Sequence, residues 1–358
     1  QHELAAVVEL RRGEHGGGVG GGGWVHGRAP GLASGRGDNA RPMTVPSTVA
    51  AAVPGPTPAL QRELARRLHK LGRVFDIPAL RRDTLPLQQV VQYYEDCHDA
   101  YRKYHSAEGA VHMALNDGDR FDPDGFFGQL RRLEAGWGAA PPADVLELAF
   151  GQGFNLEYLA RRHPGTRFHG IDLTPAHQRI AAERVRRAGL TNVALTGGDF
   201  HHLPHADASM DAVFCIEAFC YATDLPRALA EARRVLRPGG RFTLFDGYYT
   251  RSLAAMDADA ALAAELVARG MAMDTLQVQA ELLAAARAAG FVPAEPVALD
   301  AAVMPSLRRL ERVTGAVIRW PWLGRRALAR RSALRGRNIL AGYLMRTTVA
   351  MGLIGYRQ

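Results

Sequence analysis

The sequence contains few lysines and few cysteines, and both shortages limit what the protein can be. Lysine occurs only at Lys70 and Lys103, so arginine supplies nearly all of the 44 basic residues behind the net charge of +8. A GC-rich genome produces the same bias, so the charge alone predicts no nucleic-acid partner. The three cysteines, Cys97, Cys215 and Cys220, are too few for a disulfide framework and lack the spacing of a zinc site. They favour a cytoplasmic location.

Long apolar runs are also missing. No stretch approaches the roughly 18 uninterrupted apolar residues of a spanning helix, so no transmembrane segment is predicted. With 358 residues, 47% of them hydrophobic, the chain can still bury the core of one large α/β domain with additions, or of two modest domains.

Composition divides the chain into four parts. Residues 1–58 are rich in Gly, Ala and Pro and are predicted to be disordered, because they cannot bury enough apolar surface to fold alone. Residues 59–140 are predicted to form a helical segment on the substrate side. Helical spacing of apolar residues supports this over residues 58–71, 87–104 and 126–137.

Residues 141–250 alternate between apolar strand patterns and amphipathic helix patterns, from ADVLELAF to RFTLFDGYY. This alternation predicts βαβ units and a mainly parallel sheet with helices on both faces, which is a Rossmann-like α/β fold. Residues 251–358 are predicted to form a helical cap and the final sheet elements.

The segment VLELAFGQGFNLEYLA contains a strand, a tight glycine turn and a helix start. Gly151 and Gly153 would let the backbone approach a nucleotide-like ligand, although an ordinary βα turn has the same pattern. Asp172, followed by Leu173, ends the next strand, where a carboxylate can accept the ribose hydroxyls of an adenosine. Dinucleotide enzymes share these features.

A third position distinguishes dinucleotide enzymes from other proteins that bind an adenosine group. Asp199 and Phe200 follow the third strand, where an acid can face an adenine amino group and an aromatic ring can pack on the base. Dinucleotide enzymes have no matching need at this position.

The chain resembles class I S-adenosylmethionine (SAM)-dependent methyltransferases over residues 145–245. The resemblance rests on the motifs described above and on the segments MDAVFCIEAF and VLRPGGRF. The resemblance implies a Rossmann-like fold with a mainly parallel seven-stranded sheet and SAM as cofactor. It places Glu147 near the methionine amino group, Asp172 at the ribose and Asp199 at the adenine. Ala149 departs from the pattern, because the family commonly has glycine there.

Glu217 ends the fourth strand in CIEAFCY, at the edge of the sheet where α/β proteins bind ligands. Its apolar neighbours would raise its pKa toward the working range of a base, so Glu217 is the leading catalytic candidate. The alternative is a carboxylate that only hydrogen-bonds the cofactor region or a helix N-terminus.

The segment QYYEDCHDAYRKYHSAEGAVHMAL resembles the substrate side of sterol C-methyltransferases and related isoprenoid C-methyltransferases, and residues 337–356 resemble the end of the sterol enzymes. The resemblance implies that Tyr93, Tyr94 and His112 belong to the acceptor pocket, with a small hydrophobic molecule as substrate. Packing of these aromatic rings on the core is the alternative.

The basic segment near residue 320 offers two interpretations. Arginines there could receive a diphosphate through paired hydrogen bonds, which favours a prenyl diphosphate acceptor, or they could form a solvated helix face or contact an anionic membrane. The arginines are Arg308, Arg309, Arg312, Arg319, Arg325, Arg326, Arg330 and Arg331.

The sequence thus predicts C-methylation of an isoprenoid alkene, with Glu217 removing the proton from a carbocation. The alternatives are a sterol acceptor, an O- or N-methyltransferase of a small natural product, and a scaffold that no longer binds SAM. No metal site is predicted, since no set of hard carboxylate ligands can be assembled. The sequence is compatible with a homo-oligomer.

Overall fold

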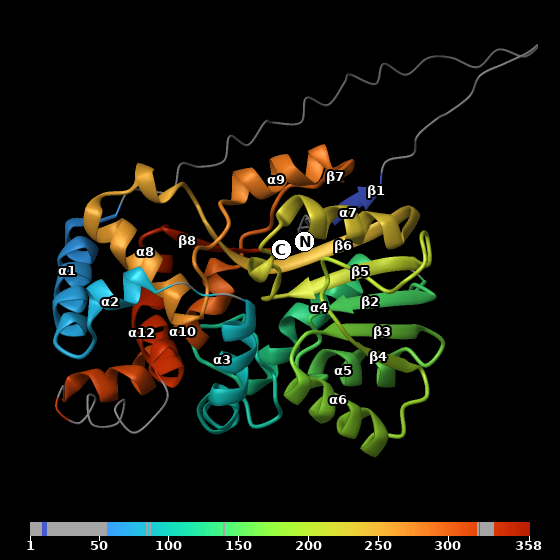
Figure 1. The fold of residues 1–358 in the computed structure, drawn as a ribbon, viewed down its shortest axis with the longest axis horizontal. Helices are drawn as coiled ribbons and strands as arrows, with labels where there is room; N and C mark the ends of the chain where they lie inside the picture. Colours follow the sequence, from blue (N-terminus) through green and yellow to red (C-terminus); the bar gives the residue numbers. More distant parts are fainter. Residues whose placement is uncertain are drawn as a thin grey trace, which may run out of the picture. The chain divides into compact units, whose positions relative to one another are not determined.

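A sheet of eight strands, with helices on both of its faces, forms the core of the described part of the chain (Figure 1). The computed structural model describes residues 9–12, 56–83, 85, 87–138, 140–320, 322 and 333–358. All five residues of β2 (Asp144–Leu148) are buried, as expected for a parallel sheet covered by helices on both sides. The sheet order is β4-β3-β2-β5-β6-β1-β7, with β8 also paired to β6.

The first five strands in this order run parallel to one another, which confirms the predicted Rossmann-like fold. They are β4 (Val193–Gly197), β3 (Arg167–Asp172), β2, β5 (Met210–Ile216) and β6 (Leu236–Tyr249). The described part of the chain gives eight strands in place of the expected seven. The extra strand arises because two short segments, β1 and β8, both pair antiparallel with β6, at different positions along it.

The first of these segments, β1 (Glu9–Arg12), lies within the stretch predicted to be disordered. It pairs with β6 and with β7 (Phe291–Pro293), so its backbone groups are satisfied on both sides. The second, β8 (Ile354–Arg357), pairs with the end of β6. Residues 1–8 and 13–55 of the Gly-rich stretch lie outside the described residues.

Helices cover both faces of the sheet, as Figure 1 shows. One face packs against α5 (Phe154–Arg162), α6 (Pro175–Arg187) and α4 (Gly128–Gly136), which follows the short helix η2 (Pro123–Phe127). The other packs against α7 (Leu225–Val235) and α9 (Gln279–Ala288). Short helices η3 (Phe219–Tyr221) and η4 (Leu253–Ala255) follow β5 and β6.

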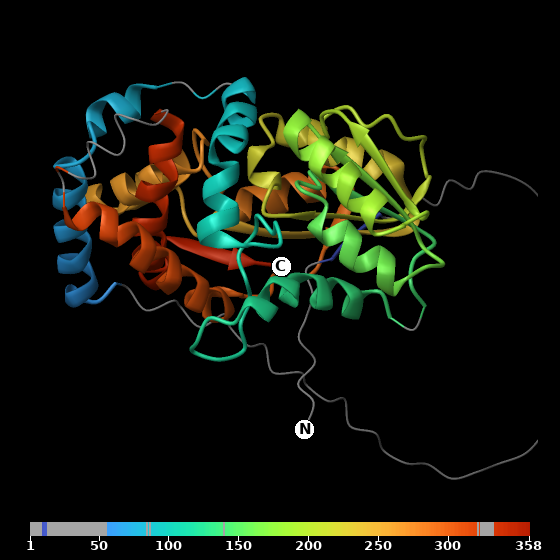
Figure 2. The same ribbon diagram turned by 90° about the horizontal axis from the view of Figure 1, so that it is seen from below.

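A second group of helices gathers around α12, beside the carboxyl ends of the strands (Figures 1 and 2). Its members are α1 (Pro58–Gly72), α2 (Ile77–Arg82), α3 (Leu87–Ala100), η1 (Tyr101–His105), α8 (Ala258–Gly270), α10 (Asp300–Arg319) and α12 (Ala333–Ala350). Helix α12 contacts α1, α3, α8 and α10. A Cβ on Gly270 would lie 2.7 Å from the Cβ of Ala341, so glycine allows α8 to approach α12 closely.

One predicted helix ends earlier than expected. The helix predicted over 87–104 ends at Ala100 and continues as the π-helical turn η1. Within the predicted helical cap, α9 begins only at Gln279, because the segment before it runs beside β6, where Tyr249 N donates to Gln277 O at 2.9 Å. None of the helices in the described ranges is long and apolar enough to cross a membrane.

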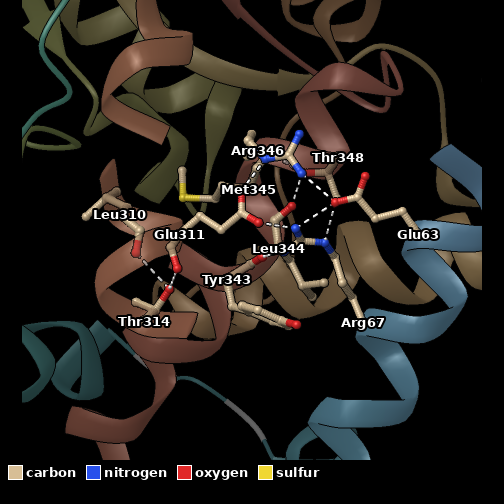
Figure 3. A network of polar contacts seen from close by, with 10 residues as sticks. All are labelled: Glu63, Arg67, Leu310, Glu311, Thr314, Tyr343, Leu344, Met345, Arg346 and Thr348. Carbon is tan, nitrogen blue, oxygen red and sulfur yellow. Dashed lines mark hydrogen bonds and ion pairs between the residues drawn. The ribbon is translucent and has the colours of Figure 1, made fainter. Parts of the chain in front are cut away.

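A polar network ties α1 to α10 and α12 (Figure 3). Arg67 of α1 forms ion pairs with Glu63 on its own helix and with Glu311 of α10, and it donates to Tyr343 O of α12 at 2.7 Å. Arg346 of α12 pairs with both Glu63 and Glu311. Two carboxylates and two guanidiniums therefore satisfy one another where three helices meet.

Candidate active site

The glycine turn after β2 has backbone conformations that favour glycine. Ala149, Gly151 and Gly153 have φ angles of 58°, 54° and 76°. A Cβ on Gly153 would come within 2.9 Å of Ala181 Cβ, so glycine is needed where the turn packs against α6. Ala149 adopts the left-handed region at a cost of roughly 1–2 kcal/mol. The departure from glycine is therefore strained, but the turn keeps its shape.

Asp172 holds this turn against the end of β3. Its Oδ2 accepts from Gly151 N and its Oδ1 accepts from Thr174 N, both at 2.8 Å. Each carboxylate oxygen has a second lone pair, so Asp172 keeps the capacity to accept hydroxyl groups of a ligand.

Glu147 lies beneath the turn and is almost completely buried. Its Oε1 accepts from Asn155 Nδ2 at 2.7 Å, while its Oε2 has no hydrogen-bond partner among the described residues. Burial raises the pKa of Glu147 to about 8, against the lowering effect of Asn155. A buried carboxylate oxygen without a partner fits a cationic ligand group such as the amino group of SAM.

A cavity, the loop cavity, lies between the turn, the carboxyl ends of the strands and α3. Seven of the nine predicted cofactor residues line it: Ala149, Gly151, Asp172, Leu173, Asp199, Phe200 and Glu217. Tyr94 lines it as well, whereas Glu147 and Gly153 do not. The structure therefore brings together residues at the ends of four strands, β2, β3, β4 and β5, which span positions 149 to 217 of the sequence.

The turn after β4 is fixed by a histidine. His201 donates its backbone N–H to Asp199 Oδ1 at 2.9 Å, and its Nδ1 lies 2.6 Å from the same oxygen. Phe200 stacks on Phe219 with ring centroids 5.7 Å apart. Both Asp199 and Phe200 are thus held in place at the cavity wall.

Glu217 occupies the end of β5 with a φ of 49°. Its Oε1 accepts from Gln129 Nε2 at 2.7 Å and from Met113 N at 2.9 Å. Burial raises the pKa of Glu217 to about 8, against the two hydrogen bonds, which lower it, while nearby Asp246 raises it further. A carboxyl group with this pKa exchanges its proton near neutral to mildly alkaline pH, and its ionised form is the base.

A second cavity, the central cavity, shares Glu217, Tyr94, Val111 and Tyr221 with the loop cavity. The rest of its wall is mainly apolar and comes from α8, α12, β8 and nearby loops: Val267, Met271, Met273, Leu276, Met345, Val349, Ile354 and Tyr356 among others. Its second acid, Asp246, has a pKa raised to about 6 by burial, although hydrogen bonds from backbone N–H groups lower it.

A third cavity, the outer cavity, continues from the central cavity toward the surface. The two share Tyr101, Met113, Met271 and Met345. The outer cavity runs between η1, α10 and α12, and the exposed side chains of Tyr104 and Val313 stand at its end. The three cavities thus form one series from the glycine turn to the protein surface.

The tyrosines predicted for the acceptor pocket have different positions. Tyr94 lies between the loop and central cavities, where its hydroxyl donates to Tyr221 at 3.1 Å and Tyr221 donates to Met271 O at 2.6 Å. Tyr93 is fully buried and lines only the outer cavity, with its hydroxyl 3.2 Å from that of Tyr101.

His112 lines none of the three cavities. Its Nε2 lies 3.1 Å from Asn155 Oδ1, and its Nδ1 lies 3.4 Å from Gln129 Nε2. Because Asn155 contacts Glu147 and Gln129 contacts Glu217, His112 joins the two carboxylates through buried amides. His112 thus lies next to two buried amides that contact these carboxylates and does not reach a cavity wall.

The described arginines of the basic segment lie away from Glu217. Arg308, Arg312 and Arg319 line a groove on α10, together with Glu311, and Arg309 lies over the ring of Phe121 at 4.5 Å. Neither lysine nor arginine lines the loop, central or outer cavity in the part of the chain that the structure describes. The other four arginines fall outside the described residues.

Sequence reasoning missed several members of the site. Three of them have no recognisable sequence pattern, because single polar residues on helices resemble ordinary surface or core positions: Gln129, Asn155 and His177. The fourth, Tyr221, follows Glu217 by four residues in EAFCY, and its closeness to the end of a predicted strand was the available clue. Among the described residues, no group of three or more His, Cys, Asp or Glu side chains could hold a metal ion.

The parallel strand order with helices on both faces of the sheet is a Rossmann-like methyltransferase fold. Residues 146–244 match the family model described as a methyltransferase domain. The predicted SAM-dependent methyltransferase domain is thereby confirmed for this part of the chain, and the residues around Glu147 and Asp172 fit SAM as its cofactor.

Curated relatives match only part of the chain. It is 31% identical over 170 residues to 24-methylenesterol C-methyltransferase 2 of Oryza sativa subsp. japonica, covering 47% of this chain and 46% of the relative. It is 41% identical over 119 residues to a phthiotriol/phenolphthiotriol dimycocerosates methyltransferase of Mycobacterium tuberculosis, covering 33% of this chain and 42% of the relative. The chain thus spans less than half the length of these relatives.

Solved structures share the fold at low identity. The [4+2]-cyclase SpnF has a TM-score of 0.59 at 20% identity, covering 75% of this chain and 94% of that chain. Geranyl diphosphate methyltransferase in complex with GPP and sinefungin has a TM-score of 0.55 at 18% identity, covering 75% and 96%. Because the first is a cyclase and the second a methyltransferase, the fold alone does not define the reaction.

Proposed function

We propose that this protein is a SAM-dependent C-methyltransferase that acts on an alkene carbon of an uncharged isoprenoid. The observation that carries this proposal is the position of Glu217, whose carboxyl group lies at the boundary of the loop and central cavities. A methyl donor in the first cavity and an alkene in the second would meet beside it.

The proposed reaction begins with attack of the alkene on the methyl group. A C–C bond forms as the S–CH3 bond breaks, and the positive charge moves to the acceptor as a carbocation. Glu217 then takes a proton from the carbon next to the cation, and the electron pair of that C–H bond forms the new alkene. When bound, SAM supplies the electrophilic methyl group.

The residues around Glu217 suit this chemistry. Gln129 and Met113 hold its Oε1 and leave Oε2 free for the acceptor, since only Oε1 accepts these bonds. The aromatic ring of Tyr94 stands at the same boundary and would stabilise a passing cation through its π face. The apolar lining excludes water, which would otherwise trap the cation.

The charges of the cavities favour an uncharged acceptor over a prenyl diphosphate. The central cavity carries two carboxyl groups, Glu217 and Asp246, and no cationic side chain among the described residues. A diphosphate placed there would lose its hydration and meet like charges. The match to a sterol C-methyltransferase over 170 residues supports the same choice.

The test is mass spectrometry of reactions with SAM and a panel of acceptors: a sterol with a side-chain alkene, geranyl diphosphate and farnesyl diphosphate. We expect a gain of one methylene mass on the sterol and its loss in Glu217→Gln, with SAM binding retained in calorimetry. Glu281→Gln, a change of an exposed acid on α9, is the matched control and should leave turnover unchanged.

Two other results would contradict the proposal. If only geranyl or farnesyl diphosphate gave a methylated product, the acceptor would be a prenyl diphosphate and not an uncharged isoprenoid. Methylation of oxygen or nitrogen in a small natural product, with Glu217→Gln fully active, would favour the O- or N-methyltransferase alternative, in which no carbon-bound proton is removed.

A further inference from the structure

Most of the large apolar side chains that are exposed in the described ranges come from η1 and from the second half of α10 with the residues just after it. Six large hydrophobic residues are exposed in the described ranges, and four of them belong to η1, α10 or the residues just after α10: Tyr104, Val313, Trp320 and Trp322. Isolated exposed apolar residues are ordinary, but a group beside a cavity mouth marks an interaction surface. We call these four side chains, with Lys103, Arg312 and Arg319, the mouth surface.

The mouth surface is continuous with the series of cavities. Tyr104 and Val313 line the outer cavity and are 41% and 37% exposed, so they stand where this cavity reaches the surface. Trp320 comes directly after the last residue of α10, seven residues beyond Val313, and lines the neighbouring groove on α10 together with Arg312 and Arg319. The outer and central cavities, which share four lining residues, therefore lie one after the other between Tyr104 and Val313 at the surface and Glu217 inside.

Basic side chains flank the exposed aromatic rings. Lys103 Nζ lies 5.3 Å from the ring centroid of Tyr104, and Arg319 Cζ lies 5.9 Å from that of Trp320. Arg312 lies on the same exposed part of α10, one residue before Val313. No carboxylate in the described part of the chain forms an ion pair with Lys103, Arg312 or Arg319, so these charges remain available to an anionic partner.

We propose that the mouth surface docks on an anionic lipid bilayer and that the acceptor enters the outer cavity directly from the membrane. Tryptophan and tyrosine with adjacent basic residues match the chemistry of the bilayer interface, where aromatic rings lie at headgroup depth and Lys and Arg are attracted to anionic lipids. A protein partner would also bury aromatic rings, but it would not explain a series of cavities that ends at the same surface.

The direct test is sedimentation of the full chain with vesicles of phosphatidylcholine, with and without phosphatidylglycerol. We expect binding to the phosphatidylglycerol vesicles that weakens as salt is raised. The double variant Trp320→Ser/Trp322→Ser should lower the partition by about tenfold or more, since two aromatic side chains no longer insert. Arg312→Glu/Arg319→Glu should remove the preference for the anionic lipid.

The matched control is Val292→Ser, which removes an equally exposed apolar side chain from β7, away from the mouth surface. It should bind vesicles like the original protein. Quenching of tryptophan fluorescence by brominated lipid, present in the original protein and lost in the tryptophan double variant, would support insertion of these rings.

Two results would overturn the proposal. One is equal vesicle binding by the original protein and both double variants. The other is a dimer in sedimentation velocity that the tryptophan variant dissociates while no vesicle binding is found, which would make a second copy the partner. Because neither SAM nor an acceptor is needed, this test stands or fails independently of the proposed methyl transfer.

Discussion

Gln129 Nε2 lies 2.7 Å from Glu217 Oε1, so a residue of α4, which precedes β2 in sequence, influences the ionisation of a residue at the end of β5. The amide hydrogen bond stabilises the charged carboxylate and therefore lowers the pKa of Glu217, while burial raises it. The balance between the two controls the pH at which Glu217 can act as a base.

Replacing Gln129 by leucine should shift the pH dependence of the proposed reaction. Without the amide donor the pKa of Glu217 rises, so the rise of kcat/KM with pH should move upward by about one pH unit. The measurement is kcat/KM from pH 6 to 10. Gln129→Glu would not test this point, since it adds a charge beside Glu217. The control is Gln92→Leu on α3, away from Glu217, which should leave the pH dependence of kcat/KM unchanged.

Replacing Glu147 by glutamine should separate cofactor binding from stability. Removing the negative charge should weaken SAM binding about tenfold or more, because the cofactor amino group loses an ionic partner. Calorimetry with SAM is the measurement. Unchanged affinity would contradict the assigned role of Glu147.

The same variant should be more stable than the original protein at alkaline pH. The folded-state pKa of Glu147 is raised to about 8, above the ordinary value of 4.5, so the folded state holds the proton more tightly and loses stability as pH rises from about 4.5 through 8. Glutamine cannot ionise. Denaturant unfolding should show the difference between variant and original growing across this range, by the order of 1–3 kcal/mol; a constant difference would contradict it.

Glycine at position 149 should stabilise the protein. Ala149 has a φ of 58°, a conformation that glycine adopts without strain, so Ala149→Gly should raise the free energy of unfolding by about 0.5 kcal/mol after the entropy cost of glycine is subtracted. Urea denaturation measures this change. Ala284→Gly, at an exposed position within α9, should do the reverse and lower stability by about 1 kcal/mol.

Removing Arg67 should loosen the helices that enclose the outer cavity. Arg67→Ala leaves Glu63 and Glu311 with only Arg346 as partner and frees the carbonyl of Tyr343, so we expect a loss of about 1–3 kcal/mol in unfolding free energy. Arg66→Ala, an exposed neighbour, should change stability by less than about 0.5 kcal/mol. Similar losses in both variants would mean that the network contributes little.

The sequence predicted the Rossmann-like core well, because local patterns encode it. Alternating strand and helix patterns located β2 to β6, and a helix needs only neighbouring residues to reveal its apolar face. Strand β1 was not predicted, since the backbone pairing of Glu9–Arg12 with β6 and β7 depends on residues more than 200 positions away.

The sequence by itself determined the glycine turn, the acids at the strand ends and Glu217, because these positions follow directly from strand boundaries that apolar patterning marks. Only the tertiary structure decided that Tyr94 lines the loop and central cavities while Tyr93 lines the outer cavity. The same is true of His112, which lines none of the three, and of the described arginines, which lie apart from Glu217. The reason is physical: which side of a helix meets a cavity depends on how that helix packs against distant elements, and no local pattern carries that information.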